Sequence, residues 1–162
     1  HLADAKVNLA LFGGYPDQIE SLRLRLRKID ARADEMVSLH PFLPPADLHR
    51  QLGKRLSLML VPLKDTHYNR FLTCPVKALD ALSHGIPTVA SDLPTTREVL
   101  EKSAFYVEPG KIKPAAKAAI EILDDASRYG RMARAAEERA ADLAWVRRAE
   151  RVVNFAGRTV SQ

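Results

Sequence analysis

Short apolar runs alternate with segments of helical periodicity along this chain, and that alternation restricts its fold more than any other feature. The apolar runs predict five strands, at residues 6–12, 36–39, 56–62, 88–91 and 104–107. The run 56–62 is apolar at almost every position, which is typical of a strand buried on both faces of a sheet. Strands that are separated by helices favour a parallel sheet with helices on both sides. The sequence therefore predicts an α/β fold.

The intervals between the strands carry the spacing of amphipathic helices. Helices are predicted at residues 17–29, with Asp17 as N-cap, at 44–52, at 75–84, from 95 onward, and at 113–125, 127–143 and 145–157, with a polar loop at 63–73. Residues 22–27 alternate strictly between Leu and Arg, so a strand is the alternative there, but the flanking apolar residues keep helical spacing. We predict a Rossmann-like doubly wound parallel sheet of about five strands with a helical C-terminal tail, in a single domain over residues 1–162.

Composition excludes several classes of protein. The chain has 25 basic and 20 acidic residues, a net charge of +5 that favours anionic partners. Five Phe, four Tyr and one Trp are scattered singly, and no nucleic-acid-binding motif is present, so we expect no nucleic-acid partner. One Cys cannot form an intrachain disulfide or a Cys-based zinc cluster. No apolar run approaches the ~18–20 residues of a membrane span, and the first residues lack the pattern of a signal peptide.

The strongest candidate site is a predicted helix N-terminus at the carboxyl edge of the sheet, where ligands of such folds bind. Thr73 and Cys74 lead into the helix that Pro75 begins. We expect free backbone N–H groups at Val76 and Lys77, the positive end of the helix dipole, worth about half a charge, and the Lys77 ammonium. These groups predict a diphosphate site.

Asp80 follows Lys77 by three residues and therefore shares its helix face. A carboxylate there could accept hydrogen bonds from vicinal sugar hydroxyls. The alternative is that Lys77 and Asp80 form only an exposed ion pair, worth about 0.2–0.5 kcal/mol.

The wider pattern resembles the donor-binding, C-terminal half of group 1 retaining glycosyltransferases of the GT-B fold. The run PVKALDALSHGIPTVASDLP, followed by REVL, matches that family at Asp80, Ala81, Gly85, Pro87, Val89, Ala90, Glu98 and Val99. Leu11–Gly14 resembles the family's glycine-rich strand end, and residues 58–62 resemble its following strand. The segment around Trp145 is similar to its closing helix, so the resemblance covers nearly the whole chain.

The resemblance implies a hexosyltransferase that moves a sugar from a nucleotide sugar to a glycan or lipid-linked acceptor, in polysaccharide biosynthesis. It implies no cofactor and no metal, and a location in the cytoplasm, either free or peripheral on the inner face of the membrane. The implied donor-binding residues are Gly13, Gly14, Thr73, Cys74, Val76, Lys77 and Asp80, with His40, Phe42 and Leu43 beside the nucleobase. No catalytic residue is assigned.

Two departures from the family pattern change these expectations. The family's first glutamate falls on Leu72, and its second falls on Asp80, which is one methylene shorter. The family's domain also begins with a further strand, central in the sheet, and a helix that carry an Arg and a Lys for the leaving diphosphate. That unit and the acceptor domain are not in this sequence. We therefore expect a fragment or a rearranged sheet, and no activity from this chain alone.

The sequence leaves several alternatives open. An epimerase of sugar nucleotides shares the GT-B fold. A non-catalytic flavodoxin-like or receiver-type domain would need acidic residues at a strand end, where only Asp92 could serve. His67 and Tyr68 either touch donor or acceptor or lie in a surface loop. The arginines at 23, 25, 27 and 32 form either a solvated face or a contact with anionic lipid. Cys74 has no partner pattern for thiol catalysis, so its thiol is expected to be structural.

Overall fold

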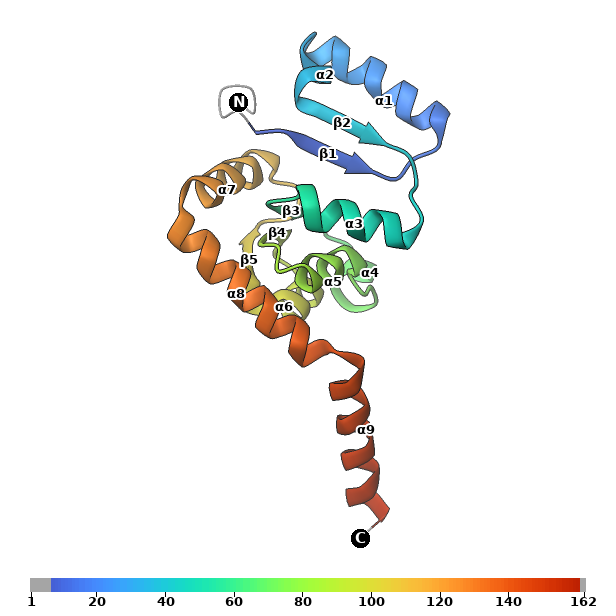
Figure 1. Cartoon of the computed structure of the whole chain (residues 1–162), viewed down its shortest axis with the longest axis vertical. Coiled ribbons are helices and arrows are strands. Elements are labelled where there is room, and N and C mark those ends of the chain that lie inside the picture. The colour runs from blue at the N-terminus through green and yellow to red at the C-terminus, as the bar shows by residue number, and fades with distance from the viewer. Residues whose placement is uncertain (1–6, 161–162) are drawn as a thin grey trace. The chain divides into compact units, whose positions relative to one another are not determined.

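The computed structural model describes the backbone of residues 7–160 and the side chains of these residues except 55 and 158–160 (Figure 1). The chain forms two compact units that meet in sequence between Lys54 and Arg55. We refer to them as the N-terminal unit and the C-terminal unit. The prediction of a single domain remains a prediction.

The N-terminal unit is a pair of parallel strands with helices between and after them. Its elements are β1 (Leu9–Phe12), α1 (Pro16–Ile29), α2 (Ala33–Met36), β2 (Val37–His40) and α3 (Pro45–Arg55), the last of which ends at the first residue of the next unit. Strand register runs from Leu9 opposite Val37 to Phe12 opposite His40. The carboxyl ends of β1 and β2 therefore lie side by side.

The alternating Leu–Arg run lies inside α1, so the helical interpretation is confirmed. The helix begins one residue before the predicted N-cap, because Pro16 is tolerated at a first helical position, where its missing N–H has no partner to lose. Tyr15 takes the N-cap position instead of Asp17, and its N–H donates to Gln18 Oε1 at 3.1 Å. The predicted start of the first strand, at residue 6, lies outside the described residues.

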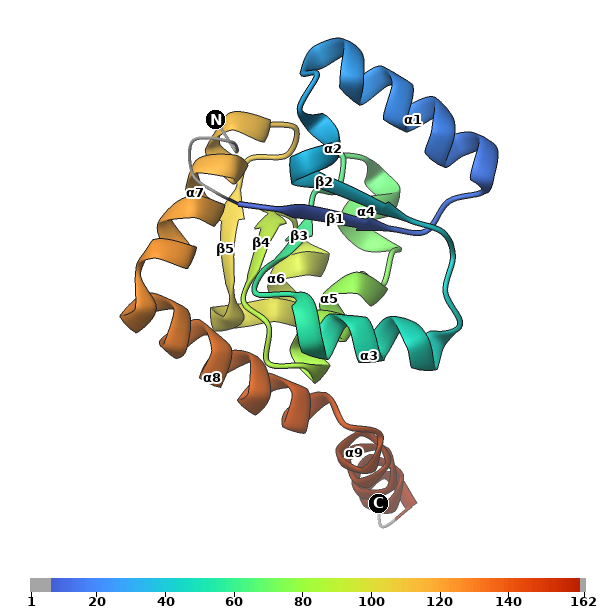
Figure 2. The same ribbon diagram turned by 45° about the horizontal axis from the view of Figure 1, so that its top comes forward.

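The C-terminal unit is a parallel sheet covered by helices on both faces. Its elements are β3 (Met59–Val61), α4 (His67–Phe71), α5 (Val76–Ser83), β4 (Thr88–Ser91), α6 (Pro94–Leu100), the 3-10 helix η1 (Glu101–Ser103), β5 (Ala104–Val107), α7 (Ile112–Asp124), α8 (Ala126–Leu143) and α9 (Trp145–Val160). β4 lies between β3 and β5 and pairs in parallel with both (Figure 2).

Alternation along β4 sends successive side chains into two separate apolar clusters. Ala90 lies in the cluster that contains Leu82 of α5, Leu100 of α6 and Ala136 of α8. Val89, its neighbour in sequence, lies in the cluster that contains Ile122 of α7. All four residues of β4 are buried, as a central parallel strand requires. The core of the unit therefore lies on both faces of its sheet.

Residues 7–160 form five parallel strands, as predicted, and these strands are divided between a two-stranded and a three-stranded sheet. The prediction of a polar loop at 63–73 is wrong for residues 67–71, which form α4. The short helix α2 was not predicted. Elements of four or five residues are too short to show a helical period. α4 nevertheless has a sequence signal at its start, because Thr66 Oγ1 caps it by accepting from the Asn69 N–H at 3.1 Å. Within residues 7–160, no helix is long and apolar enough to cross a membrane.

Candidate functional site

The start of α5 is the first candidate site, and its backbone differs from the prediction in one respect. Pro75 is the N-cap, and its carbonyl accepts from the Ala78 N–H at 2.8 Å. The Val76 N–H was predicted to be free, but it donates to the Cys74 carbonyl at 2.9 Å. The Val76 N–H is therefore engaged in a tight turn directly before the helix. Among the described residues, the Lys77 N–H has no hydrogen-bond partner, so it remains available to a ligand.

The packing of α5 fixes which of its side chains reach solvent. Ala78, Ala81 and Leu82 are buried in the core, and they hold the helix against the sheet. Lys77 is exposed and Asp80 is half-buried. The first turn of α5 therefore presents a backbone donor, the dipole's positive end and an ammonium group on a helix that is anchored along its other face.

The segment before α5 is held by its own hydrogen bonds. The N–H groups of Leu72 and Thr73 both donate to the Tyr68 carbonyl, at 2.9 and 3.0 Å. Thr95 Oγ1 of α6 donates to the Asn69 carbonyl at 2.6 Å, which ties α4 to α6. Thr73 is half-buried and Cys74 is exposed, so the thiol and the hydroxyl stand directly before the helix start.

Two arginine–aspartate pairs flank this region. Arg70 donates from Nε to Asp65 Oδ1 at 2.5 Å and from Nη2 to Asp65 Oδ2 at 2.7 Å, and this guanidinium lowers the pKa of the carboxyl. Arg97 binds Asp92, just beyond β4, in the same way and lowers its pKa. Because Asp92 is engaged by Arg97, the acidic residue that a receiver-type domain would need at a strand end is already paired.

In the N-terminal unit, Gly13 lies against His40 and Phe42 at the carboxyl ends of β1 and β2. The Gly13 N–H donates to the His40 carbonyl at 3.1 Å, and Gly13 has a φ of 97°, which favours glycine. A Cβ on Gly13 would lie 3.2 Å from Phe42 Cε1. The His40 ring stacks on Phe12 with centroids 4.6 Å apart. This edge is therefore compact around the glycine pair.

Gly14 and Leu43 complete the predicted set in this unit. A Cβ on Gly14 would lie 3.2 Å from Ile19 Cγ1, so the chain passes close to α1 there. Leu43 is half-buried. Sequence reasoning missed Tyr15, whose ring meets Phe42 edge-on with centroids 5.4 Å apart. Its signal was its place directly after the glycine pair at a strand end.

Other predicted residues have local roles. His67 begins α4 and its ring lies 5.2 Å from that of Phe71, while Tyr68 is mostly exposed. Of the arginines at 23, 25, 27 and 32, Arg23, Arg27 and Arg32 face carboxylates of their own unit, at Glu20, Asp34 and Asp30. This pairing favours a solvated face over a lipid contact. No group of three or more His, Cys, Asp or Glu among the described residues is placed to hold a metal.

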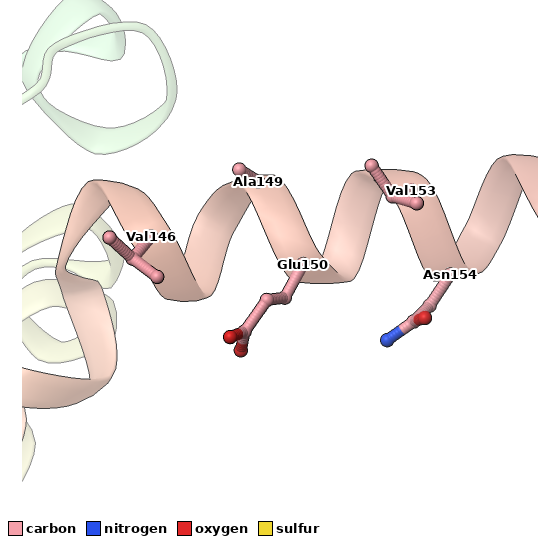
Figure 3. A pocket seen from close by; sticks show the side chains of 5 residues that line it. All are labelled: Val146, Ala149, Glu150, Val153 and Asn154. Carbon is pink, nitrogen blue, oxygen red and sulfur yellow. The ribbon is translucent and has the colours of Figure 1, made fainter.

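A surface pocket of ≈ 470 Å³ lies along α9 and holds none of the predicted site residues (Figure 3). Its lining comes from one helix: Val146, Ala149, Glu150, Val153 and Asn154. Apolar Val146, Ala149 and Val153 follow one side of the helix and polar Glu150 and Asn154 follow another. This pocket is therefore the side of an amphipathic helix, and we do not assign ligand chemistry to it.

Comparison with known proteins gives the chain its family. Residues 1–125 match the family described as glycosyl transferases group 1. The crystal structure of Anabaena Alr3699/HepE in complex with UDP is similar, with a TM-score of 0.63 and 20% sequence identity over 87% of this chain and 39% of that chain. The present chain therefore spans about two fifths of that protein. No curated protein matches the chain. Since the family match extends over well more than half of the sequence, the chain belongs to the group 1 glycosyltransferases and has the Rossmann-like α/β fold of the GT-B type.

Proposed function

We propose that this chain supplies the nucleotide-sugar donor site of a glycosyltransferase that moves a sugar from a nucleoside diphosphate to a glycan or lipid-linked acceptor. The observation that carries the proposal is the start of α5. There a partnerless Lys77 N–H and the Lys77 ammonium stand together at the positive end of an anchored helix. Such an end binds anions without special side-chain chemistry. Membership of the glycosyltransferase family makes the pyrophosphate of a sugar nucleotide the fitting anion.

The role of these groups follows from the chemistry of sugar transfer. The bond between the sugar C1 and the β-phosphate oxygen breaks, and its electron pair leaves with the nucleoside diphosphate. An acceptor hydroxyl oxygen forms the new bond to C1 and loses its proton. Negative charge therefore grows on the diphosphate, where prearranged donors and a cation stabilise it most. Lys77 serves the leaving group in this proposal, and Asp80 accepts hydrogen bonds from sugar hydroxyls.

The proposal has consequences for the whole enzyme. Helix dipole and ammonium replace a metal at the diphosphate, so transfer needs no metal and no other cofactor. The acceptor is bound by a part of the enzyme outside these 162 residues, so the chain alone binds the donor but does not transfer sugar. We place the intact enzyme in polysaccharide assembly, in the cytoplasm or peripherally on the inner face of the membrane.

Titration calorimetry of the chain with UDP, GDP and ADP tests the donor site. Lys77→Ala removes one charge-assisted contact, so it is expected to weaken nucleotide binding by about 1–3 kcal/mol. Lys113→Ala is a matched control, because Lys113 is the exposed second residue of α7 just as Lys77 is of α5. We expect the control to bind like the wild type. Equal affinities for the wild type and the Lys77 variant would remove Lys77 from the site.

A further inference from the structure

The last helix of the C-terminal unit, α9, buries none of its described side chains. Residues 145–157 are all exposed, and the large apolar side chains of Trp145 and Val153 are 81% and 67% exposed. Val146, Ala149 and Val153 follow one another along one side of the helix (Figure 3). A helix of this length is marginal in water unless its apolar side is covered. A covering surface is therefore expected for α9.

The polar residues of α9 carry an excess of positive charge. The helix contains four arginines and one glutamate, and so holds three of the five excess positive charges of the chain. Arg147 contacts Glu150 at 3.2 Å. Among the described residues, no carboxylate faces Arg148 or Arg151, and the Arg148 guanidinium lies over the Trp145 ring, 5.5 Å from its centroid. The charge of these two guanidinium groups is left for an external anion to balance.

Two other arginine-rich helices have their charge balanced within the chain. In α8, four arginines are accompanied by three acidic residues, and Met132 and Ala136 are buried. In α1, Arg23 and Arg27 face carboxylates of their own unit. α9 differs from both, because it combines an uncovered apolar side with basic charge that its own residues do not balance.

We propose that α9 lies in the interface of an anionic lipid bilayer, with its apolar side toward the acyl chains and its arginines at the phosphate groups. Apolar burial and attraction to anionic lipids both favour such binding for a basic amphipathic helix. Trp145 supplies an aromatic ring of the kind enriched at the membrane–water interface. A second copy of α9 is a poorer cover, because the two sets of four arginines would repel each other.

This inference goes beyond the proposed function, because lipid binding by α9 does not require a donor site at α5. It also differs from a membrane span, since an interfacial helix lies along the surface and does not cross it. The chain's attachment to lipid and its affinity for nucleotide can therefore be measured independently.

Sedimentation of the 162-residue chain with lipid vesicles tests the inference. We expect binding to vesicles of phosphatidylglycerol and phosphatidylcholine in equal parts, and binding about tenfold weaker to pure phosphatidylcholine. Trp145 is the one tryptophan of the sequence, so tryptophan fluorescence reports on α9. Its emission is expected to move to shorter wavelength on binding, because the ring leaves water. Added salt is expected to weaken binding, since it screens the arginines.

Two double variants separate the apolar from the electrostatic contribution. Val146→Gln with Val153→Gln removes apolar surface at unchanged charge, and it is expected to weaken vesicle binding by about tenfold. Arg147→Gln with Arg148→Gln removes two charges, and a loss of about tenfold is expected here too.

Matched controls come from α7. Ile112→Gln replaces an apolar side chain that is 80% exposed, and Lys113→Gln with Lys117→Gln removes two exposed charges. Both controls are expected to bind vesicles like the wild type, because α7 takes no part in the proposed contact.

Four results would overturn the inference. The first is wild-type chain that binds neither kind of vesicle, or both equally well. The second is binding without a shift of the Trp145 emission, since another surface would then be attached. The third is an equal loss in the α7 controls, since total charge would then be decisive. The fourth is a dimer that forms in place of the vesicle complex, with α9 covered by a second copy. Nucleotide affinity, measured without lipid, decides the proposed function in each case.

Discussion

The two units of the chain are built from the same kind of element but are buried to very different degrees. In the C-terminal unit, β4 is buried along its whole length, and Leu82 and Ile122 are buried on its two sides. In the N-terminal unit, Ala33 and Leu52 are the buried residues among those described, and no residue of β1 is buried. Parallel strands normally need cover on both faces. The start of α5 therefore stands on a packed core, whereas the β1–β2 pair has little buried surface of its own.

The largest expected difference between the units is the loss of unfolding free energy when a leucine side chain is truncated. Leu82→Ala leaves a cavity between α5 and the sheet, and it is expected to lower the free energy of unfolding by about 2–5 kcal/mol. Leu24→Ala, on the half-exposed face of α1, is expected to cost less than about 0.5 kcal/mol. Urea denaturation of both variants measures the difference. Similar costs at the two positions would contradict the difference in burial between the units.

Amide hydrogen exchange measures the difference between the units for individual strands. The amides of Val89 and Ala90 in β4 are expected to exchange only through large openings of the C-terminal unit. Those of Ala10 and Leu11 in β1 are expected to exchange on the order of a hundredfold faster, because few buried contacts oppose local opening there. Mass spectrometry of peptic fragments resolves the two strands. Slower exchange from β1 than from β4 would contradict the contrast in burial.

Each unit contains a glycine with positive φ, so an alanine substitution there measures how much backbone strain the unit tolerates. Gly13 and Gly85 have φ values of 97° and 63°, and an added Cβ would lie 3.2 Å from Phe42 and 3.0 Å from Glu137 respectively. Alanine at either position is strained by about 1–2 kcal/mol. We expect Gly85→Ala to lower the urea midpoint more, since a loosely packed unit relaxes around the strain at Gly13. A larger shift for Gly13→Ala would show that the N-terminal unit is the stiffer one.

Acid stability gives the smallest expected effect. Arg97 lowers the pKa of Asp92, so the folded state favours the charged carboxylate. This contribution is present above the ordinary Asp value of 3.8 and is lost as pH falls through the lower folded value. Wild-type chain should therefore lose a little more thermal stability between pH 5 and 3 than Asp92→Asn does. Parallel melting curves of the two proteins over that interval would contradict the pairing.

Sequence alone was sufficient where burial dominates. The strands Thr88–Ser91 and Ala104–Val107 have the predicted bounds. Each is a short apolar run bounded by turn-forming residues such as Pro and Gly, and such a pattern is typical of a buried strand. Each end of the helices α7 and α8 lies within one residue of its predicted position. Long amphipathic segments carry enough repeats to fix both period and length.

Prediction failed where structure depends on contacts that no short window encodes. The division of five strands into two sheets depends on which strand edges find partners, and the sequence pattern does not specify this. The hydrogen bond from the Val76 N–H to the Cys74 carbonyl arises from the turn at Pro75. The sequence pattern of a helix start does not reveal this turn. Tyr15 follows the glycine pair in the sequence, but only the structure shows that its ring lies beside that of Phe42.

The most direct test is a crystal structure of the chain grown with saturating UDP. We predict that the β-phosphate lies within hydrogen-bond distance of the Lys77 N–H and the Lys77 Nζ at the start of α5. A diphosphate bound at any other place, or an α5 N-terminus left vacant at saturation, would contradict the account.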